Sequence, residues 1–324
     1  QGQVVAGHPE LRGKRLHARR VRTLDLPVLP QNMVAAVGLP DIGVPEPVDL
    51  RELAEGLWPY ENLILFTVAP DGYPVDVLNP EAVRRFIAVT HERYAECVGE
   101  FFGNTIPGIF TDETSLGGRL GASAAPWFGG MMELLAAQTG RDFRIYLPLL
   151  FSPDCVGRDV FGRYSDHEIV AARCEYYDLL TRRFGESYWQ QITDWCTAHG
   201  LIHTGHVGGE DNLPDNLSFG HFFRTAGVLP IPGVDVIWRQ LFPGQRVFPF
   251  PRLASSAMKQ AEARGGSPAG VGDSSWAGSV LTESNAVYGF GLHYGQMRWL
   301  LDVQAHCGVN FYAPMAVQYT TSDG

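Results

Sequence analysis

Two short apolar runs in this sequence end abruptly in acidic residues. Residues 107–111 contain strong strand formers, and Asp112 and Glu113 follow them at once. Far downstream, the run at 279–282 ends in the same way at Glu283. A carboxylate at the end of a buried strand is unfavourable unless it has a use there. Because functional residues of α/β barrels lie at the carboxyl ends of the strands, this pattern predicts a parallel sheet with acids along one edge.

Helical and strand-like segments alternate through most of the chain. Asn79 and Pro80 are typical of a helix start, and Ser165 with Glu168 has the spacing of a capping box. Five strands are expected between the helices, at 106–111, 201–206, 234–238, 279–282 and 309–313. We therefore predict an α/β fold, a (β/α)8 TIM-barrel-type domain whose other strands are obscure or lie upstream of Gln1.

The character of the sequence divides it into three expected parts. Residues 1–20 are polar and basic, which predicts a loop with a short helix leading out of an upstream segment. Residues 21–75 are rich in Pro, Val and Leu without a helical period, which indicates a small β-rich insertion. Residues 76–324 are expected to form the barrel-type domain. The sequence at both ends is what we would expect of a segment taken from a longer protein.

Composition excludes several classes of protein. The net charge of −10 argues against nucleic acid as a partner, and no run of about 18 apolar residues predicts a membrane span. The five cysteines are widely spaced without a CxxC motif, so buried free thiols are favoured, with one disulfide as the alternative. Motifs of serine hydrolases, P-loop proteins and Rossmann domains are missing from their required contexts, so no organic cofactor is expected.

Polar clusters follow four of the predicted strands. The pair Glu113 and Glu283 has the residue types that glycosidic cleavage requires: an acid for the leaving oxygen, and a carboxylate that attacks carbon or activates water. A second cluster includes His206 and Glu210, and Asn285 follows Glu283. A weaker cluster includes Asp235 and Arg239. A purely structural role, capping a helix or pairing with an arginine, would explain any one of these acids equally well.

The same side chains are also candidate ligands of a metal ion. Asp112 and Glu210 would supply oxygen ligands for calcium, whereas several histidines with a glutamate would favour zinc. Trp276, shortly before Glu283, is the best candidate for an aromatic platform under a sugar ring, although ordinary packing is the simpler role for most aromatics here.

An ordered set of motifs resembles a known enzyme family. Residues 79–87, 90–94 and 107–113 resemble segments of the large bacterial α-L-rhamnosidases of glycoside hydrolase family 106 and their unclassified relatives. The resemblance continues at 204–210, 232–236, 281–283 and 308–310 and covers about residues 76–320. Thr114 departs from the family, in which proline usually follows the Phe-Thr-Asp-Glu motif.

This resemblance implies a catalytic domain of a long, multidomain, secreted protein, extracellular or periplasmic. It implies hydrolysis with inversion, and a calcium ion that helps to hold the sugar. The family's acid corresponds to Glu113, and its later carboxylates correspond to Glu210 and Glu283. Glu283 is our choice for the general base, with Glu210 binding sugar or metal. The first barrel strands of the family would precede Gln1, and its accessory β-domains would follow Gly324.

The resulting hypothesis is an exo-acting glycoside hydrolase that removes a terminal deoxyhexose, with L-rhamnose as the first choice of sugar. Glu113 is the expected acid, Glu283 the expected base, and Asp112, His206, Glu210, Trp276 and Asn285 the expected substrate-binding residues, with a carbohydrate as the partner. Three alternatives stay open. They are a retaining glycosidase with Glu113 as acid/base and Glu283 as nucleophile, a non-catalytic carbohydrate-binding barrel, and a metal-dependent hydrolase of another bond using His206, Glu210 and Asp112.

Overall fold

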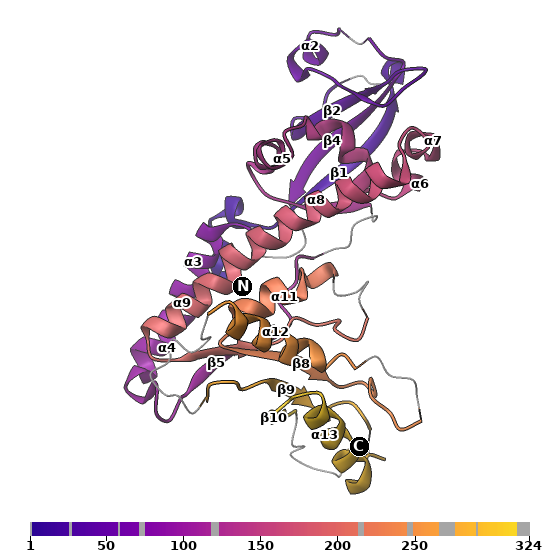
Figure 1. Cartoon of the computed structure of the whole chain (residues 1–324). Helices are drawn as coiled ribbons and strands as arrows, with labels where there is room; N and C mark the ends of the chain where they lie inside the picture. Colours follow the sequence, from indigo (N-terminus) through magenta and orange to yellow (C-terminus); the bar gives the residue numbers. More distant parts are fainter. Residues whose placement is uncertain are drawn as a thin grey trace. The chain divides into compact units, whose positions relative to one another are not determined.

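The computed structural model divides the chain into two compact units, each with its own sheet (Figure 1). Unit 1 comprises residues 1–89 and 116–183, and unit 2 comprises residues 90–115 and 184–324. The structure describes residues 2–25, 28–57, 59–70, 75–117, 123–212, 217–244, 249–265, 276–289 and 291–315. The two units therefore each draw on separate stretches of the sequence, so the chain passes between them more than once.

Unit 1 is built on a five-stranded antiparallel sheet. Its strands, in the order β3-β2-β4-β1-β6, are Glu46–Pro47, Met33–Leu39, Asn62–Pro70, Lys14–Arg22 and Ala124–Trp127. β4 lies inside the sheet because four consecutive residues, Leu63 to Phe66, are all buried, as a strand covered on both faces requires. Leu63 and Leu65 pack with Ala36 of β2 in one hydrophobic cluster.

Helices of unit 1 occur before, between and after these strands. They are α1 (Gly2–Val5), α2 (Leu50–Ala54), α3 (Pro80–Val89), α5 (Met131–Thr139), α6 (Pro153–Val156), α7 (Arg158–Phe161) and α8 (Asp166–Phe184), whose last residue belongs to unit 2. The predicted capping box at the start of α8 is present. Glu168 accepts hydrogen bonds from the backbone N–H and hydroxyl of Ser165 at 2.8 and 2.7 Å.

Unit 2 contains a five-stranded parallel sheet in which the strands follow chain order. They are β5 (Gly108–Thr111), β7 (Ile202–Gly205), β8 (Ile231–Val236), β9 (Leu281–Ser284) and β10 (Phe311–Pro314). All five predicted strands are found, with boundaries shifted by up to three residues. Sequential parallel strands that wind in one direction are typical of a barrel wall, whereas a doubly wound sheet reverses its order. The described residues thus form part of a barrel-like wall, and the complete eight-stranded barrel stays a prediction.

Helices precede the first of these parallel strands and lie in the connections between them. They are α4 (His91–Val98), α9 (Gln191–Ala198), α11 (Phe222–Thr225), α12 (Arg252–Ala263) and α13 (Tyr294–His306), with a π-helical turn at Gly185–Gln190. Ile202, Ile231 and Leu281, near the starts of three adjacent strands, form a buried cluster. Their packing fixes the amino ends of β7, β8 and β9, and the opposite ends of these strands lie together at one edge of the sheet.

The compact units differ from the expected division of the sequence. Residues 1–20 contain α1, but Lys14 already begins β1, because this strand pairs along its whole length with β4. Unit 1 also extends beyond residue 75 and takes up residues 116–183, which lie in the connection between β5 and β7. Pairing of β6 with β1 brings that distant stretch into unit 1, and such long-range pairing leaves no local signal in the sequence.

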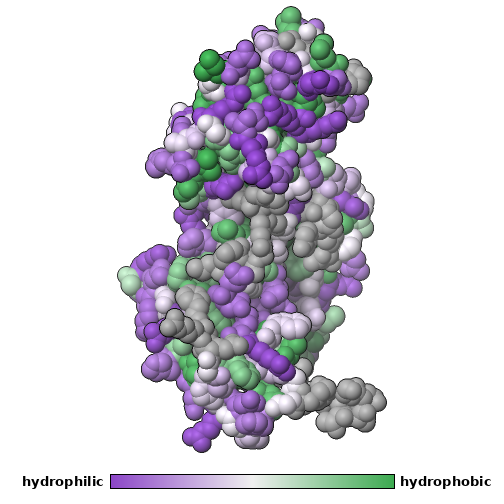
Figure 2. Space-filling view, turned by 90° about the vertical axis from the view of Figure 1, so that its right-hand side faces the viewer, coloured by the Kyte–Doolittle hydropathy of each residue, from purple (hydrophilic) through white to green (hydrophobic). Residues whose placement is uncertain are grey.

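The surface combines polar and apolar side chains. On the face that Figure 2 shows, hydrophilic and hydrophobic residues are interspersed. Among the described residues, no helix has the length and apolar character needed to cross a membrane.

The closeness of the parallel strands yields a first prediction. A Cβ atom on Gly233 of β8 would lie 2.5 Å from the carbonyl oxygen of Gly205 in β7 and 3.0 Å from a methyl group of Leu281 in β9. Gly233→Ala should therefore destabilise unit 2 by about 1–3 kcal/mol, the usual effect of overpacking. The measurement is urea unfolding followed by tryptophan fluorescence. Gly99→Ala is the matched control, because a Cβ there meets nothing within 4 Å, and an equal effect of both changes would contradict this view of the sheet.

Candidate active site

Ionisable side chains converge at the carboxyl ends of four adjacent parallel strands in unit 2. Asp112 and Glu113 follow β5, and His206 follows β7. Asp235 lies near the end of β8, and Glu283 lies near the end of β9. The structure therefore brings together the acids that the sequence places 170 positions apart, from Glu113 to Glu283.

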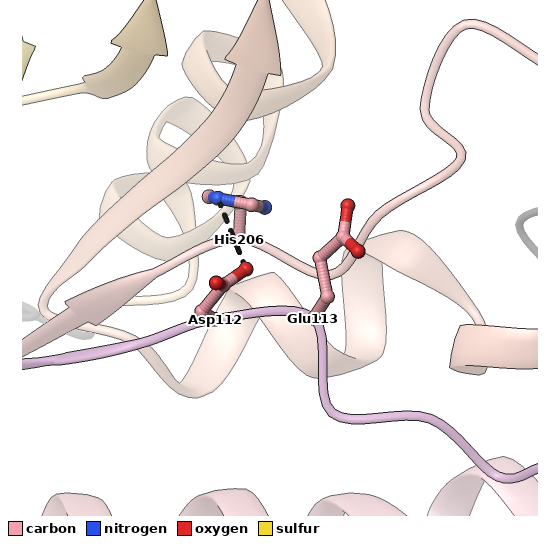
Figure 3. A group of neighbouring side chains, drawn as sticks. All are labelled: Asp112, Glu113 and His206. Carbon is pink, nitrogen blue, oxygen red and sulfur yellow. Dashed lines mark ion pairs between the residues drawn. The ribbon is translucent and has the colours of Figure 1, made fainter. Parts of the chain in front are cut away.

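His206 lies at the centre of this acidic cluster. Its side chain is only 1% exposed, and its Nε2 atom donates a hydrogen bond to Oε2 of Glu283 at 3.0 Å. The same nitrogen lies 3.7 Å from Oδ1 of Asp112, a contact that Figure 3 shows as a dashed line. Burial alone would lower the pKa of His206, but the bond to Glu283 and the charges of Glu210, Asp235 and Glu283 raise it to about 9. His206 is therefore an imidazolium at neutral pH.

Glu113 lies beside Asp112 and His206 and has a strained backbone conformation. Its φ angle is +39°, in the left-handed region that residues with side chains rarely adopt. Figure 3 shows its carboxyl next to Asp112 and His206. Partial burial raises the pKa of Glu113, His206 opposes the shift, and the charges of Asp112 and Glu283 add to it. Strain and a raised pKa in one residue are typical of functional sites.

Gly208 leaves room for the side chain of Glu113. A Cβ atom at Gly208 would lie 3.1 Å from Oε1 of Glu113 and 3.0 Å from the ring of Phe219. The φ angle of Gly208 is +98°, which also favours glycine. The connection after β7 thus accommodates both His206 and the carboxyl of Glu113.

Asp235 and Glu283 are neighbours across the sheet. The two residues are paired in register between the parallel strands β8 and β9, so their side chains lie on the same face. Asp235 is 4% exposed, and burial raises its pKa to about 8. His206 opposes this shift, whereas Glu210, Glu283 and Glu113 increase it. Asp235 therefore holds a proton at neutral pH and belongs to the site more firmly than its weak sequence pattern indicated.

Glu210 is the most deeply buried acid of the group. It is 1% exposed, and burial raises its pKa, opposed by the charge of His206 and by backbone N–H groups of Gly208 and Glu210 itself. Even so, no hydrogen bond of good geometry from a described residue reaches either carboxylate oxygen. Oδ1 of Asp235 and Oδ1 of Asn285 are buried without such a bond as well. Buried oxygens in this condition suit the ligand sphere of a hard cation such as calcium.

Two overlapping sets of three side chains have the spacing of metal ligands among the described residues. Asp112, Glu113 and His206 form one, and His206, Asp235 and Glu283 form the other, each with its ligand atoms within 4.8 Å of one another. Glu210 belongs to neither set, so the expected pairing of Glu210 with Asp112 on one ion stays a prediction. The carboxylate oxygens in these two sets are the ligand type that a hard cation such as calcium prefers.

The remaining expected site residues occupy different ends of the sheet. Asn285 directly follows β9 with a φ angle of +73°, and its backbone N–H donates to the carbonyl of Val236 at 3.2 Å. Trp276 precedes β9 and packs on Phe311, the first residue of β10, with 5.4 Å between ring centroids. Trp276 also contacts the hydrophobic cluster near the starts of the strands. The structure therefore does not bring Trp276 to the acidic cluster.

A buried histidine beneath the site fixes the end of β5. Both ring nitrogens of His203 lie 2.8 Å from threonine hydroxyls, Nε2 from Thr111 and Nδ1 from Thr193. The ring also stacks on Trp189, and burial lowers the pKa of His203 to about 3. A neutral His203 thus anchors Thr111, the residue directly before Asp112.

Comparison with known proteins adds a structural neighbour. No protein-family model matches this sequence, and no curated protein matches it. Among solved structures, a rhamnosidase from Novosphingobium sp. PP1Y is similar, with a TM-score of 0.57 and 17% sequence identity over 91% of this chain. The chain shares the fold of part of that rhamnosidase. It spans 27% of the length of that protein, and the likeness does not distinguish family 106 from other families with this fold.

The shifted pKa of Asp235 yields a second prediction. In the folded protein Asp235 retains its proton up to a pH of about 8. In the unfolded chain the same side chain loses this proton above its ordinary pKa of 3.8. The stability associated with this proton is complete below that value and is lost progressively as pH rises to about 8. Asp235→Asn cannot titrate, so its melting temperature relative to the unmodified protein should improve from pH 5 to pH 8 and then level off.

The expected relative gain is at least about 2–4 °C, the shift that roughly 1 kcal/mol produces in a domain of this size. Melting curves in calcium-free buffer provide the measurement. The exposed Asp302→Asn on α13 is the control and should show no such trend. A melting difference for Asp235→Asn that stays constant with pH would show that Asp235 is ionised in the folded protein.

Proposed function

We propose that this chain is the catalytic part of a glycoside hydrolase that removes a terminal deoxyhexose from a glycan or glycoside. L-rhamnose is the first choice for this sugar. The observation that carries the proposal is the group of carboxyls around His206 at the carboxyl edge of a parallel sheet, in a fold shared with a rhamnosidase. Paired carboxyls with different proton affinities are what hydrolysis of a glycosidic bond needs.

Glu113 is proposed as the general acid. Its raised pKa favours the protonated form, and its position at a strand end gives access to the glycosidic oxygen. As the bond between the anomeric carbon and this oxygen breaks, the Glu113 proton passes to the leaving oxygen. Asp112, beside it, is proposed to bind a sugar hydroxyl.

Glu283 is proposed as the general base of an inverting reaction. Its carboxylate would take a proton from water while the water oxygen attacks the anomeric carbon on the face opposite the leaving group. His206 holds this carboxylate through the 3.0 Å hydrogen bond. In the retaining alternative, Glu283 itself attacks carbon, and Glu113 later removes a proton from the incoming water.

Calcium is proposed as a resident ion, with Glu210 and Asp112 as ligands and with Asn285 and Asp235 close by on the neighbouring strands. A bound calcium ion would hold sugar hydroxyls and neutralise acids. Following the resemblance to family 106 enzymes, we also propose that the chain works outside the cytoplasm as part of a longer, multidomain protein; the chain spans 27% of the length of the rhamnosidase neighbour.

A third prediction tests the acid. Glu113→Gln should lower kcat by about 10²–10⁴-fold on a rhamnoside with a poor leaving group, because the leaving oxygen must then depart without a proton. On p-nitrophenyl α-L-rhamnoside, whose leaving group needs little protonation, the loss should be much smaller. Rhamnose release measured on both substrates gives the comparison, with Glu96→Gln on α4 as the exposed control.

NMR detection of the first rhamnose anomer released, in the same assay, separates inversion from retention. Equal losses on the two substrates would contradict the assignment of Glu113. If the unmodified protein binds rhamnosides without turnover, the hydrolase proposal is wrong and the alternative of a carbohydrate-binding barrel takes its place.

A fourth prediction concerns calcium. Adding calcium to EDTA-treated protein should raise the melting temperature and the rhamnoside turnover. At a calcium concentration 100-fold above Kd, the free energy of unfolding should increase by about 2.7 kcal/mol. Glu210→Gln should abolish most of the thermal shift, because it removes the charge of the most buried ligand. Calorimetric melting with and without calcium checks this, with Glu96→Gln as the control. An unchanged calcium shift in Glu210→Gln would place the ion elsewhere.

A further inference from the structure

A cavity lies beyond the ends of the two strands that carry Asp235 and Glu283. It has a volume of about 180 Å³, several times the roughly 30 Å³ share of one water molecule. Its walls come from the segments that follow β8 and β9 and from the first turns of α13, and they include Phe242, Tyr288 and Gln296. Arg239 contributes the positive charge to this lining. A cavity of this size and polarity can take one sugar-sized group.

The two segments that form the cavity are joined to each other and are strained. The backbone N–H of Trp238 donates to the carbonyl of Ala286 at 3.2 Å. Trp238, Arg239, Asn285 and Val287 all have positive φ angles, between +53° and +73°. For a β-branched residue such as Val287 this conformation is a true outlier. Strain of this kind persists where a site requires a particular backbone path.

Arg239 is an exposed residue that a hydrogen bond from its Nε nitrogen anchors at the wall of the cavity. Its Nε donates to the carbonyl of Tyr288 at 3.1 Å, and Nη2 lies over Gly289, 3.2 Å from where a Cβ would be. The hydroxyl of Tyr288 donates to the carbonyl of Leu241 at 3.1 Å and accepts from its N–H at 3.3 Å, so Tyr288 is fixed as well. No carboxylate among the described residues forms an ion pair with Arg239, which leaves its terminal nitrogens for an anionic ligand.

We propose that this cavity binds an acidic sugar, a hexuronic acid, with its carboxylate on Arg239. The planar guanidinium matches a carboxylate with two parallel hydrogen bonds. Tyr288 and Phe242 give apolar surface for a sugar ring, and Trp238, which is 67% exposed, stands next to Arg239 in the chain. The inference rests on the proposed function in one respect: the acidic sugar is the leaving-group side of the glycoside that Glu113 and Glu283 would cleave.

Direct binding tests the cavity without any catalytic step. Isothermal titration of the unmodified chain with methyl β-D-glucuronoside should show binding on the order of tenfold tighter than with methyl β-D-glucoside, as expected for a charge-assisted pair. Arg239→Ala should remove this preference and leave the weaker glucoside binding in place. Arg264→Ala is the matched control: Arg264 is exposed at the end of α12, outside the cavity lining, and the preference should persist.

A turnover assay then connects the cavity to cleavage. For a rhamnosyl-glucuronate disaccharide, Arg239→Ala should raise KM about tenfold, whereas for the matching rhamnosyl-glucose the KM should stay the same. The proposal is overturned if the unmodified chain shows no preference for the glucuronoside, or if Arg239→Ala weakens both ligands equally. Preferential glucuronoside binding through Arg239 without rhamnose release would uphold the cavity and reject the hydrolase, so the two failures are distinguishable.

Discussion

The buried imidazolium of His206 is the interaction on which the acidic edge of the sheet depends. Parallel strands bring their carboxyl ends to one edge, and four of these ends carry acids here. Without a positive charge among them, mutual repulsion and loss of water would oppose folding. His206 lies within 3.0 Å of Glu283 and 3.7 Å of Asp112 and interacts with Glu210 and Asp235. One cation thus offsets several anions, and protons on the remaining acids reduce the rest of the charge.

Incomplete compensation gives the acids different proton affinities. Asp235 and Glu210 are buried more deeply than Glu113. For each of these two acids, burial is the main cause of the raised pKa. Glu113 reaches solvent and also has a raised pKa, which fits a residue that exchanges a proton with a ligand. Both carboxylate oxygens of Glu210 and Oδ1 of Asp235 are buried without a well-formed hydrogen bond from described residues, which is unusual for a cluster that only stabilises the fold.

Much of the sheet of unit 2, but less of its site, could be predicted from the sequence. Apolar runs between helix caps are local signals, and all five parallel strands were found from them. Glu113, His206 and Glu283 were selected because they follow such runs. Asp235 gave only a weak signal because it lies inside a buried strand, where its register with Glu283 matters and cannot be read locally. Trp276 was expected near the acids, but it precedes β9 and packs at the opposite end of the strands.

Separate parts of unit 2 carry the acids and the cation Arg239. The acids are fixed by strand register and by His203 beneath β5, so they belong to the rigid sheet. Arg239 belongs to a connecting segment, where sequence can change without disturbing the core. An anion would be repelled by the acidic cluster alone, and the chain as a whole carries a net charge of −10. A guanidinium anchored on the carbonyl of Tyr288, beyond the strand ends, is therefore the group that would offset this repulsion for the acidic sugar proposed above.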